Sequence, residues 1–262
     1  MSRKHRSDIW KPEKNLVKEI IAQYQNGISA RQLGLKHGVA DVTITALLKR
    51  NNVVIRNRSD AKRTNQINEN IFDDIQTEEQ FYWLGFILAD GNIYHPQKRS
   101  KQLNFGLKES DWEHLEKFKK FIGSNKSLYY NNNAVFVSFY SNRICSKLEK
   151  YGIVPRKSLI VKVPEFCKNN RHFWRGMIDG DGWLGFNKNG YPYLGLCGTP
   201  NIIQNFIDFA QIQTSVNGEK SIKETCCYGN VTKQVSFVLY NNSNIYLNRK
   251  FDMFLSIQRW ML

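Results

Sequence analysis

Two aspartates at the ends of two similar segments are the side chains of this sequence best suited to chemistry. Asp90 lies near the end of Phe81–Gly91, and Asp181 lies near the end of Phe173–Gly182, 91 residues further along the chain. Each segment begins with aromatic residues, carries small residues four positions apart and ends in Asp-Gly, which indicates a duplicated small domain. Carboxylates beside the free carbonyls of helix ends suit a hard divalent cation, and magnesium is the one we expect.

The small residues predict that the two segments are helices packed closely against each other. Gly85 and Ala89 lie on one helix face, and so do Gly176 and Gly180. Glycine inside a helix costs about 1 kcal/mol relative to alanine, so its repeated use indicates a packing requirement. Small residues at this spacing let two backbones approach closely. We expect the glycine after each acid to end its helix in the left-handed conformation.

The windows Trp83–Gly91 and Trp174–Gly182 resemble the two copies of the LAGLIDADG motif of homing endonucleases and related maturases. The resemblance covers residues 71–262. It implies an α+β fold of two αββαββα halves, at 71–165 and 166–262, related by a pseudo-twofold axis. In that fold the motif helices lie at the centre, and the antiparallel sheets form a saddle over DNA.

The patterning around the motifs predicts the same order of elements in both halves. In the first half it predicts strands at Asn92–Tyr94, Gln102–Lys108, Lys126–Asn131 and Ala134–Tyr140, and helices at Asp111–Ile122 and Arg143–Tyr151. In the second half it predicts strands at Leu184–Phe186, Tyr191–Leu196, Ser221–Tyr228 and Val231–Tyr240, and helices from Pro200 and from Asn244.

The resemblance also implies the chemistry, which is magnesium-dependent cleavage of both strands of a long DNA target. Asp90 and Asp181 would each hold a Mg²⁺ and serve one strand, aided by the carbonyls of Ala89 and Gly180. Such metals stabilise the attacking water and the leaving 3′-oxygen of phosphodiester hydrolysis. Cleavage in this family crosses the minor groove and leaves short 3′ overhangs.

Basic residues are expected beside the metals, where they would orient solvent and offset phosphate charge. Lys157 lies 67 residues after the first acid, in a stretch that resembles the Gly-Ile-x-Pro-x-Lys-Ser segment of the family, and Lys250 lies 69 residues after the second. The sixth motif position, often acidic in the family, is Leu88 in one copy and Asp179 in the other. Because the eighth position holds the metal, we expect this difference to leave cutting intact. On the second strands, only Lys108 could act near the metals.

Residues 1–55 are expected to form a separate helix-turn-helix domain. The patterning predicts helices at Asn15–Asn26, Ala30–His37 and from Asp41 to about Asn51. The stretch from Gly27 to Val39 resembles the helix-turn-helix of resolvase-like and regulator proteins. The third helix would be the recognition helix, and its base-contacting residues are Asp41, Thr43, Thr45 and Lys49. Residues 56–70 would be a basic linker, in which Arg56 and Arg58 contact phosphates.

Strand faces over the major groove would read the bases, although the sequence does not determine their register. On the first sheet the candidates are Asn92, Tyr94, Lys98, Arg99, Lys101, Gln102, Asn104, Lys126, Tyr129 and Asn131. On the second sheet they are Asn187, Lys188, Tyr191, Tyr193, Lys223, Tyr228 and Lys233.

The composition favours a folded protein with a polyanionic partner. Of 262 residues, 38 are basic and 23 acidic, and the net charge is +15. Hydrophobic residues make up 41%, too many for a disordered chain. No apolar run is long enough for a membrane span, and no signal-peptide core follows the basic N-terminus, so we expect a soluble intracellular protein. Two motif copies in one chain imply a monomer.

Two other functions remain open. One is an RNA-binding maturase that assists intron splicing, which would share the fold and the basic charge. The other is a transcription regulator that combines a LAGLIDADG-like domain with a helix-turn-helix. Such regulators tend to lose the catalytic acids, whereas both acids are present here. An intein is disfavoured, because the chain begins with Met1 and lacks a terminal His-Asn.

Overall fold

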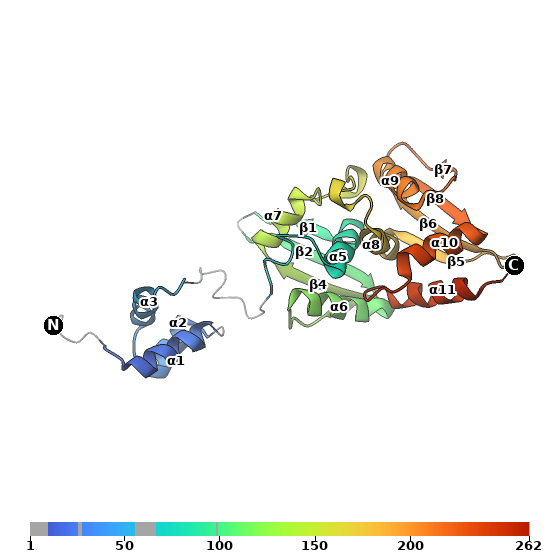
Figure 1. Ribbon diagram of the computed structural model, residues 1–262. Helices are drawn as coiled ribbons and strands as arrows, with labels where there is room; N and C mark the ends of the chain where they lie inside the picture. Colours follow the sequence, from blue (N-terminus) through green and yellow to red (C-terminus); the bar gives the residue numbers. More distant parts are fainter. Residues whose placement is uncertain (1–9, 26–27, 56–66, 98, 262) are drawn as a thin grey trace. The chain divides into compact units, whose positions relative to one another are not determined.

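A computed structural model describes residues 10–25, 28–55, 67–97 and 99–261. The chain divides into two compact units, Met1–Thr64 and Asn65–Leu262 (Figure 1). Three of the expected DNA contacts, Arg56, Arg58 and Lys98, lie outside the described residues. So does most of the predicted linker, although Ile67 near its end packs against the core of the second unit.

In the part of the first unit that the structure describes there are three helices, as predicted. They are α1 (Lys14–Gln25), α2 (Ala30–His37) and α3 (Asp41–Arg50). Ser29 caps α2 in a capping box with Gln32, and Gly38 ends the helix in the left-handed conformation, with φ of 66°. The buried core of this unit includes Ile20, Leu33 and Leu48.

The second unit contains two similar halves in sequence. The first half has α5 (Glu78–Ala89), β1 (Asn92–Tyr94), β2 (Gln102–Lys108), α6 (Trp112–Ile122), β3 (Tyr129–Asn131), β4 (Ala134–Tyr140) and α7 (Asn142–Lys150). Short 3₁₀ turns lie at Glu109–Asp111, Lys157–Leu159 and Glu165–Cys167. The second half has α8 (Arg171–Asp181), β5 (Gly182–Phe186), β6 (Pro192–Gly198), α9 (Pro200–Ala210), β7 (Val216–Asn217), β8 (Lys223–Tyr228), α10 (Gly229–Tyr240) and α11 (Asn248–Arg259).

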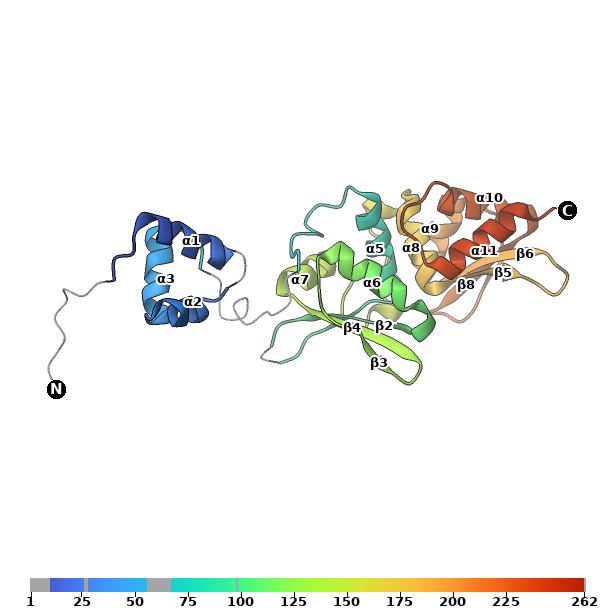
Figure 2. The same cartoon turned by 90° about the horizontal axis from the view of Figure 1, so that it is seen from below.

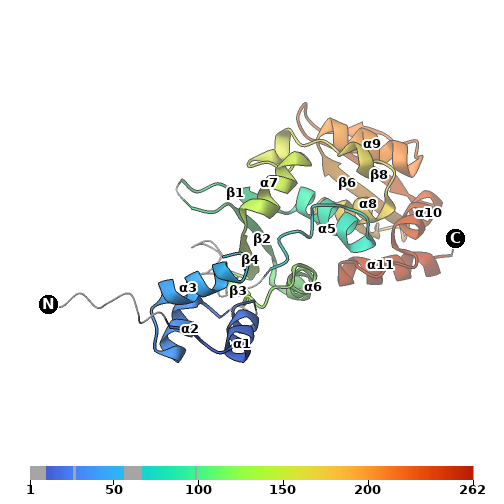
Figure 3. The same cartoon turned by 60° about the vertical axis from the view of Figure 1, so that its left-hand side comes forward.

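Each half forms one antiparallel four-stranded sheet. The strand orders are β1-β2-β4-β3 in the first sheet and β5-β6-β8-β7 in the second, so the topology repeats. The sheets lie on either side of the central pair α5 and α8 (Figures 1 and 3). Helices cover one face of each sheet and leave the other face open (Figure 2). This arrangement confirms the predicted α+β fold with a duplicated topology.

The prediction of a strand at Val231–Tyr240 is wrong, because this segment belongs to helix α10. Its buried residues are Thr232, Val235, Ser236, Leu239 and Tyr240. That spacing of three and four residues is helical, whereas the apolar content of the segment is also typical of a strand. The last strand pair is therefore β7 with β8, and the second half ends in two helices.

The motif helices approach each other as closely as their small residues predict. A Cβ placed on Gly85 would lie 2.1 Å from the carbonyl oxygen of Phe173, and one placed on Gly176 would lie 2.1 Å from that of Tyr82. Real Cβ atoms do not come this near a backbone oxygen. The contact between α5 and α8 therefore requires glycine at both positions.

The prediction of left-handed glycines after the two acids is wrong. Gly182 is extended, with φ of −95° and ψ of 173°, and Gly91 is not among the glycines with positive φ. A Cβ on Gly91 would lie 2.7 Å from the carbonyl oxygen of Ile87, and one on Gly182 would lie 2.7 Å from that of Ile178. The chain leaves each helix directly into a strand, and glycine is needed for close passage over the last helical turn.

None of the helices in the described residues is long and apolar enough to span a membrane.

Candidate active site

The two motif aspartates meet where the helices α5 and α8 end. Asp90 is the residue that follows α5, and Asp181 is the last residue of α8. A Cβ placed on Gly180 would lie 2.4 Å from the Cβ of Ala89 and 3.5 Å from Oδ2 of Asp90. The structure therefore brings together the four residues that were expected to form the metal site.

The charge of Asp90 acts on the carboxyl group of Asp181. Burial, together with the nearby charge of Asp90, raises the pKa of Asp181 to about 6. Partial desolvation by the surrounding protein also raises the pKa of Asp90, and the charges of Lys250 and Lys157 lower it. The side chain of Asp90 nevertheless reaches solvent. A bound cation would offset the repulsion and favour the ionised form of both acids.

The two carboxylates fit a magnesium ion that takes most of its ligands from water and substrate and not from the protein. Within the described part of the chain, no three His, Cys, Asp or Glu side chains are grouped as a metal cluster. Magnesium commonly binds through one or two carboxylates and completes its shell with water and substrate phosphates. Asp90 and Asp181 supply those carboxylates. The carbonyl of Ala89, an expected further ligand, accepts a hydrogen bond from Nζ of Lys157 at 3.1 Å.

Lys157 is buried beneath the end of α5, with a relative exposure of 8%. Its Nζ donates to the carbonyls of Ala89 at 3.1 Å and Gly91 at 2.6 Å. Burial lowers the pKa of Lys157, while the charges of Asp181 and Asp90 raise it. The ammonium group thus satisfies free carbonyls at the helix C-terminus and lies close enough to act on both acids.

Lys250 occupies the corresponding place beneath the end of α8, with a relative exposure of 4%. Its Nζ donates to the carbonyls of Ile178 at 2.5 Å, Asp179 at 2.8 Å and Gly182 at 2.7 Å. Burial lowers its pKa to about 8. Since an ammonium group has three N–H donors, Lys250 uses all of them on backbone carbonyls, whereas Lys157 uses two.

Asp179, at the sixth motif position, joins the two halves of the unit. Its carboxylate accepts hydrogen bonds from the hydroxyls of Tyr82 and Tyr240, both at 2.6 Å, and from the N–H of Leu247 at 2.7 Å. Burial raises the pKa of this carboxyl, and the three donors oppose that shift. Tyr82 belongs to α5 and Asp179 to α8, so the bond crosses the contact between the motif helices. The sequence did not predict that Asp179 links the two halves. The one available signal was an acidic residue among the apolar residues of the motif helix.

A cavity of about 190 Å³ opens beside Asp90. Its lining residues are Phe86, Asp90, Gly106, Leu107, Lys108, Asp111, Asp179, Leu247 and Arg249. Nε of Arg249 donates to both carboxylate oxygens of Asp111 at 3.1 Å. Lys108, the residue of the second strands that was expected near the acids, lines this cavity together with Asp90. No sequence signal indicated the pair of Asp111 and Arg249, which are 138 positions apart.

The side of Asp181 differs from that of Asp90. There Sγ of Cys197 donates to the backbone carbonyl of Asp181 at 3.4 Å. The two acids therefore have different neighbours, a lysine and an ion pair for Asp90 and a thiol for Asp181.

The architecture is similar to that of known DNA-cleaving proteins. No protein-family model matches the sequence, and no curated protein matches it. Among solved structures, the meganuclease I-AabMI bound to uncleaved DNA is 12% identical, with a TM-score of 0.51 over 68% of this chain and 89% of that one. The I-SmaMI endonuclease bound to cleaved DNA is 11% identical, with a TM-score of 0.52 over 71% and 88%. I-CpaMI bound to uncleaved DNA is 10% identical, with a TM-score of 0.52 over 70% and 90%. This chain has the LAGLIDADG fold.

On the first sheet of the LAGLIDADG fold, the register determines which of the expected DNA contacts share a face. Asn92 pairs with Asn104, and Tyr94 pairs with Gln102, so these four side chains lie on the open face. Arg99 is exposed in the loop between β1 and β2.

Two expected DNA contacts of the first half already have partners. Nζ of Lys101 donates to Glu149 at 2.6 Å and to Ser146 at 3.0 Å, both on α7. Nζ of Lys126 donates to the carbonyl of Ser138 at 2.5 Å and lies 5.0 Å from the centre of the Tyr140 ring. These contacts compete with DNA for both lysines.

The expected DNA contacts of the second half lie in different parts of that half. Tyr193 and Tyr228 pair with each other on the open face of the second sheet. Asn187, Lys188 and Tyr191 are exposed in the turn between β5 and β6.

Two lysines of the second half do not lie on the open face of the second sheet. Lys223 shares the helix-covered face with the buried Thr225, and its Nζ donates to the carbonyl of Gly218 at 2.8 Å. Lys233 is on helix α10 and not on a strand, and its Nζ donates to the carbonyl of Trp260 at 2.9 Å. The expectation that Lys233 reads bases from a strand face is therefore wrong.

In the first unit, α3 presents Asp41 and Lys49 to solvent, while Thr43 and Thr45 are half-buried. The hydroxyl of Thr45 donates to the carbonyl of Asp41 at 2.9 Å.

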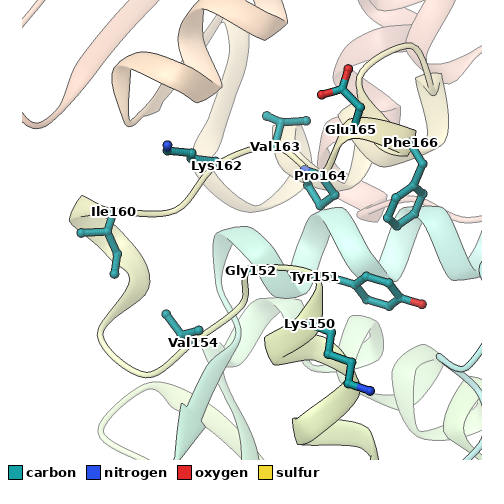
Figure 4. Close-up of a pocket in the computed structure, with 10 residues that line it drawn as sticks. All are labelled: Lys150, Tyr151, Gly152, Val154, Ile160, Lys162, Val163, Pro164, Glu165 and Phe166. Carbon is teal, nitrogen blue, oxygen red and sulfur yellow. The ribbon is translucent and has the colours of Figure 1, made fainter.

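A second cavity, of about 420 Å³, lies in the segment that joins the two halves (Figure 4). Tyr151, Pro164 and Phe166 give it an apolar wall, and Lys150 and Lys162 lie at its edges. It contains neither the motif acids nor the two buried lysines.

Proposed function

We propose that this protein is a site-specific DNA endonuclease that makes a double-strand break in a long target with the help of Mg²⁺. The observation that carries the proposal is the pair of carboxylates, Asp90 and Asp181, at two abutting helix ends. At each helix end a buried lysine, Lys157 or Lys250, donates hydrogen bonds to the backbone carbonyls. A structural role alone would not require two acids that repel each other in this position.

Because the motif is duplicated, each copy supplies one acid, and each acid acts on one DNA strand. Asp90 serves one DNA strand and Asp181 the other, so that both acids are needed for a double-strand break. Mg²⁺ held there would offset the charge that develops on the scissile phosphate and on the 3′-oxygen. Lys157 keeps one N–H free for water or phosphate, whereas Lys250 acts as a fixed positive charge at the end of α8.

Duplex DNA is the partner that the charge and the open sheet faces favour. The chain carries a net charge of +15, and the solved neighbours I-AabMI and I-SmaMI were crystallised with DNA. Because one chain supplies both halves, the protein acts as a monomer. The first unit extends the contact through α3, with Asp41, Thr43, Thr45 and Lys49 toward the major groove.

The test is a cleavage selection with the full chain and a randomised duplex library. We expect defined double-strand cuts in the presence of Mg²⁺ and none in EDTA. Enrichment of a duplex without cutting would favour the regulator. Binding to a structured intron RNA, with no binding to duplex DNA, would favour the maturase.

A further inference from the structure

The open face of the first sheet carries few charged side chains. The strand register gives four rows across this face. The rows are Tyr94, Gln102 and Tyr140; Asn92, Asn104 and Ser138; Gly106, Phe136 and Tyr129; and Lys108, Ala134 and Asn131. Amide and aromatic side chains therefore dominate the face.

The aromatic side chains are presented to solvent and are not part of the core. Tyr94 is 53% exposed, Tyr129 is 64%, Phe136 is 38% and Tyr140 is 46%. The ring of Phe136 lies over Gly106, where a Cβ would come within 2.7 Å of it, and its centre is 6.4 Å from that of Tyr129. The face thus offers an apolar surface at several positions.

The basic residues that read guanine are almost absent from these strands. No arginine occurs in β1, β2, β3 or β4, and Lys108 at the end of β2 is their only lysine. In the major groove, arginine and lysine pair with guanine, and asparagine and glutamine pair with adenine. Apolar side chains contact the methyl group of thymine. Apart from Lys108, the amide and aromatic side chains of this face match adenine and thymine.

The open face of the second sheet is different. Its rows are Trp183, Gly195 and Cys226; Gly185, Tyr193 and Tyr228; and Cys197, Glu224 and Asn217. It carries one amide, Asn217 on the short strand β7, and an exposed acid, Glu224, of the type that accepts from cytosine. Aromatic side chains occur on both open faces, but the amide side chains that match adenine are concentrated on the first sheet, which has four of them against one on the second.

We propose that the half of the DNA target bound by the first sheet is rich in A·T pairs. Gln102, Asn104 and Asn92 contact adenines, and the four aromatic side chains contact thymine methyl groups. This inference rests on the proposed function, because it requires that the open sheet face lies in the major groove of a duplex.

The experiment is a binding selection with the full wild-type chain, a randomised duplex library and EDTA, so that no cutting is needed. We expect one half of the enriched site to consist mainly of A·T pairs. Q102A and N104A should each relax the base preference at positions in that half only. Loss of one bidentate pair should reduce the affinity for the selected site roughly fivefold to a hundredfold.

Two neighbouring tyrosines provide a matched control. Tyr129 lies on the open face, whereas Tyr130 pairs with the buried Val135 and points to the other side of the same strand. Replacement of thymine by deoxyuracil in the A·T-rich half removes only methyl groups and should weaken binding of the wild type. That loss should be smaller in Y129A and unchanged in Y130A.

The outcomes separate this inference from the proposed function. A selected site that is G·C-rich in both halves, or one that is insensitive to deoxyuracil and to Q102A and N104A, would overturn the inference even if the protein cuts DNA. An A·T-rich half that depends on these residues would support the inference even if the protein fails to cut. If no duplex is enriched, both proposals are wrong.

Discussion

At the residue scale, the two buried lysines occupy equivalent places but use their hydrogens differently. Lys250 gives its three N–H groups to carbonyls at the end of α8, and Lys157 gives two to the end of α5. Lys250 is therefore more strongly tied to the structure of its helix end. Lys157 retains a donor that can act on solvent or phosphate.

The first prediction concerns these two lysines. K250M should lower the free energy of unfolding by more than K157M does, because it leaves three carbonyls at a helix end without their donor, whereas K157M leaves two. Loss of such partners costs about 1–3 kcal/mol. Urea denaturation of the two variants measures the difference. Equal losses, or a larger loss in K157M, would contradict the assignment of Lys250 as the more structural lysine.

The second prediction concerns the titration of Asp181, whose pKa is raised to about 6. Because the folded pKa lies above the usual value of 3.8, the folded state holds this proton more tightly. The stabilising contribution is complete below pH 3.8 and is lost as the pH rises through about 6. The same ionisation should strengthen Mg²⁺ binding over that interval.

The measurement is the carboxyl resonance of Asp181 followed by NMR in the metal-free protein. D90N should lower the pKa of Asp181, since the charge of Asp90 contributes to the upward shift, but burial should keep it above the ordinary value. An unchanged pKa in D90N would show that the two acids do not interact.

The sequence predicted the central residues of this site, because the motif acids and the spaced lysines are local or repeated signals. The pair of Asp111 and Arg249 could not be predicted, since it joins residues 138 positions apart across the two halves. The bonds of Asp179 to Tyr82 and Tyr240 depend in the same way on tertiary packing.

At the element scale, the contact between α5 and α8 holds the two acids in position. The third prediction is that G85A and G176A each destabilise the protein strongly, because the added methyl group would meet a backbone oxygen at 2.1 Å. Overpacking of this kind typically costs about 1–3 kcal/mol. Thermal or urea denaturation measures it.

Gly106→Ala is the matched control for these glycine substitutions. There the added methyl group meets only the ring of Phe136, a side chain on the open sheet face that is free to shift. Comparable losses in all three variants would contradict the assigned role of the helix contact.

Sequence patterns predicted most elements, since long amphipathic segments and Asp-Gly endings are local signals. They failed for α10, because its apolar content is also typical of a strand, and the helical spacing of the buried residues 232, 235, 236, 239 and 240 becomes evident only in the structure. They also failed for Gly91 and Gly182, because a close approach to a helix carbonyl is a tertiary constraint and not a local conformational preference.

At the scale of the whole molecule, polar bonds fasten the two LAGLIDADG halves to each other. The fully buried Arg175 of α8 donates to Glu78 of α5 at 2.6 Å, and Asp179 accepts from Tyr82. Such bonds hold one acid in a fixed position relative to the other, which a coordinated cut of two strands requires.

The fourth prediction concerns the first unit. Deletion of residues 1–60 should shorten the footprint on the selected DNA and weaken binding, while the positions of the cuts stay the same. Its helices form a core of their own, and α3, the proposed recognition helix, would contact DNA outside the saddle. Footprinting of the full and shortened chains measures this. An unchanged footprint would show that the first unit does not contact the DNA.

The measurement that tests the central claim most directly is strand-resolved cleavage of the selected target with D90N and D181N beside the wild type. We predict that the wild type cuts both strands in Mg²⁺, that each variant loses cutting of one strand, and that the strand lost differs between the two variants. Undiminished double-strand cutting by either variant would contradict the assignment of one acid to each strand.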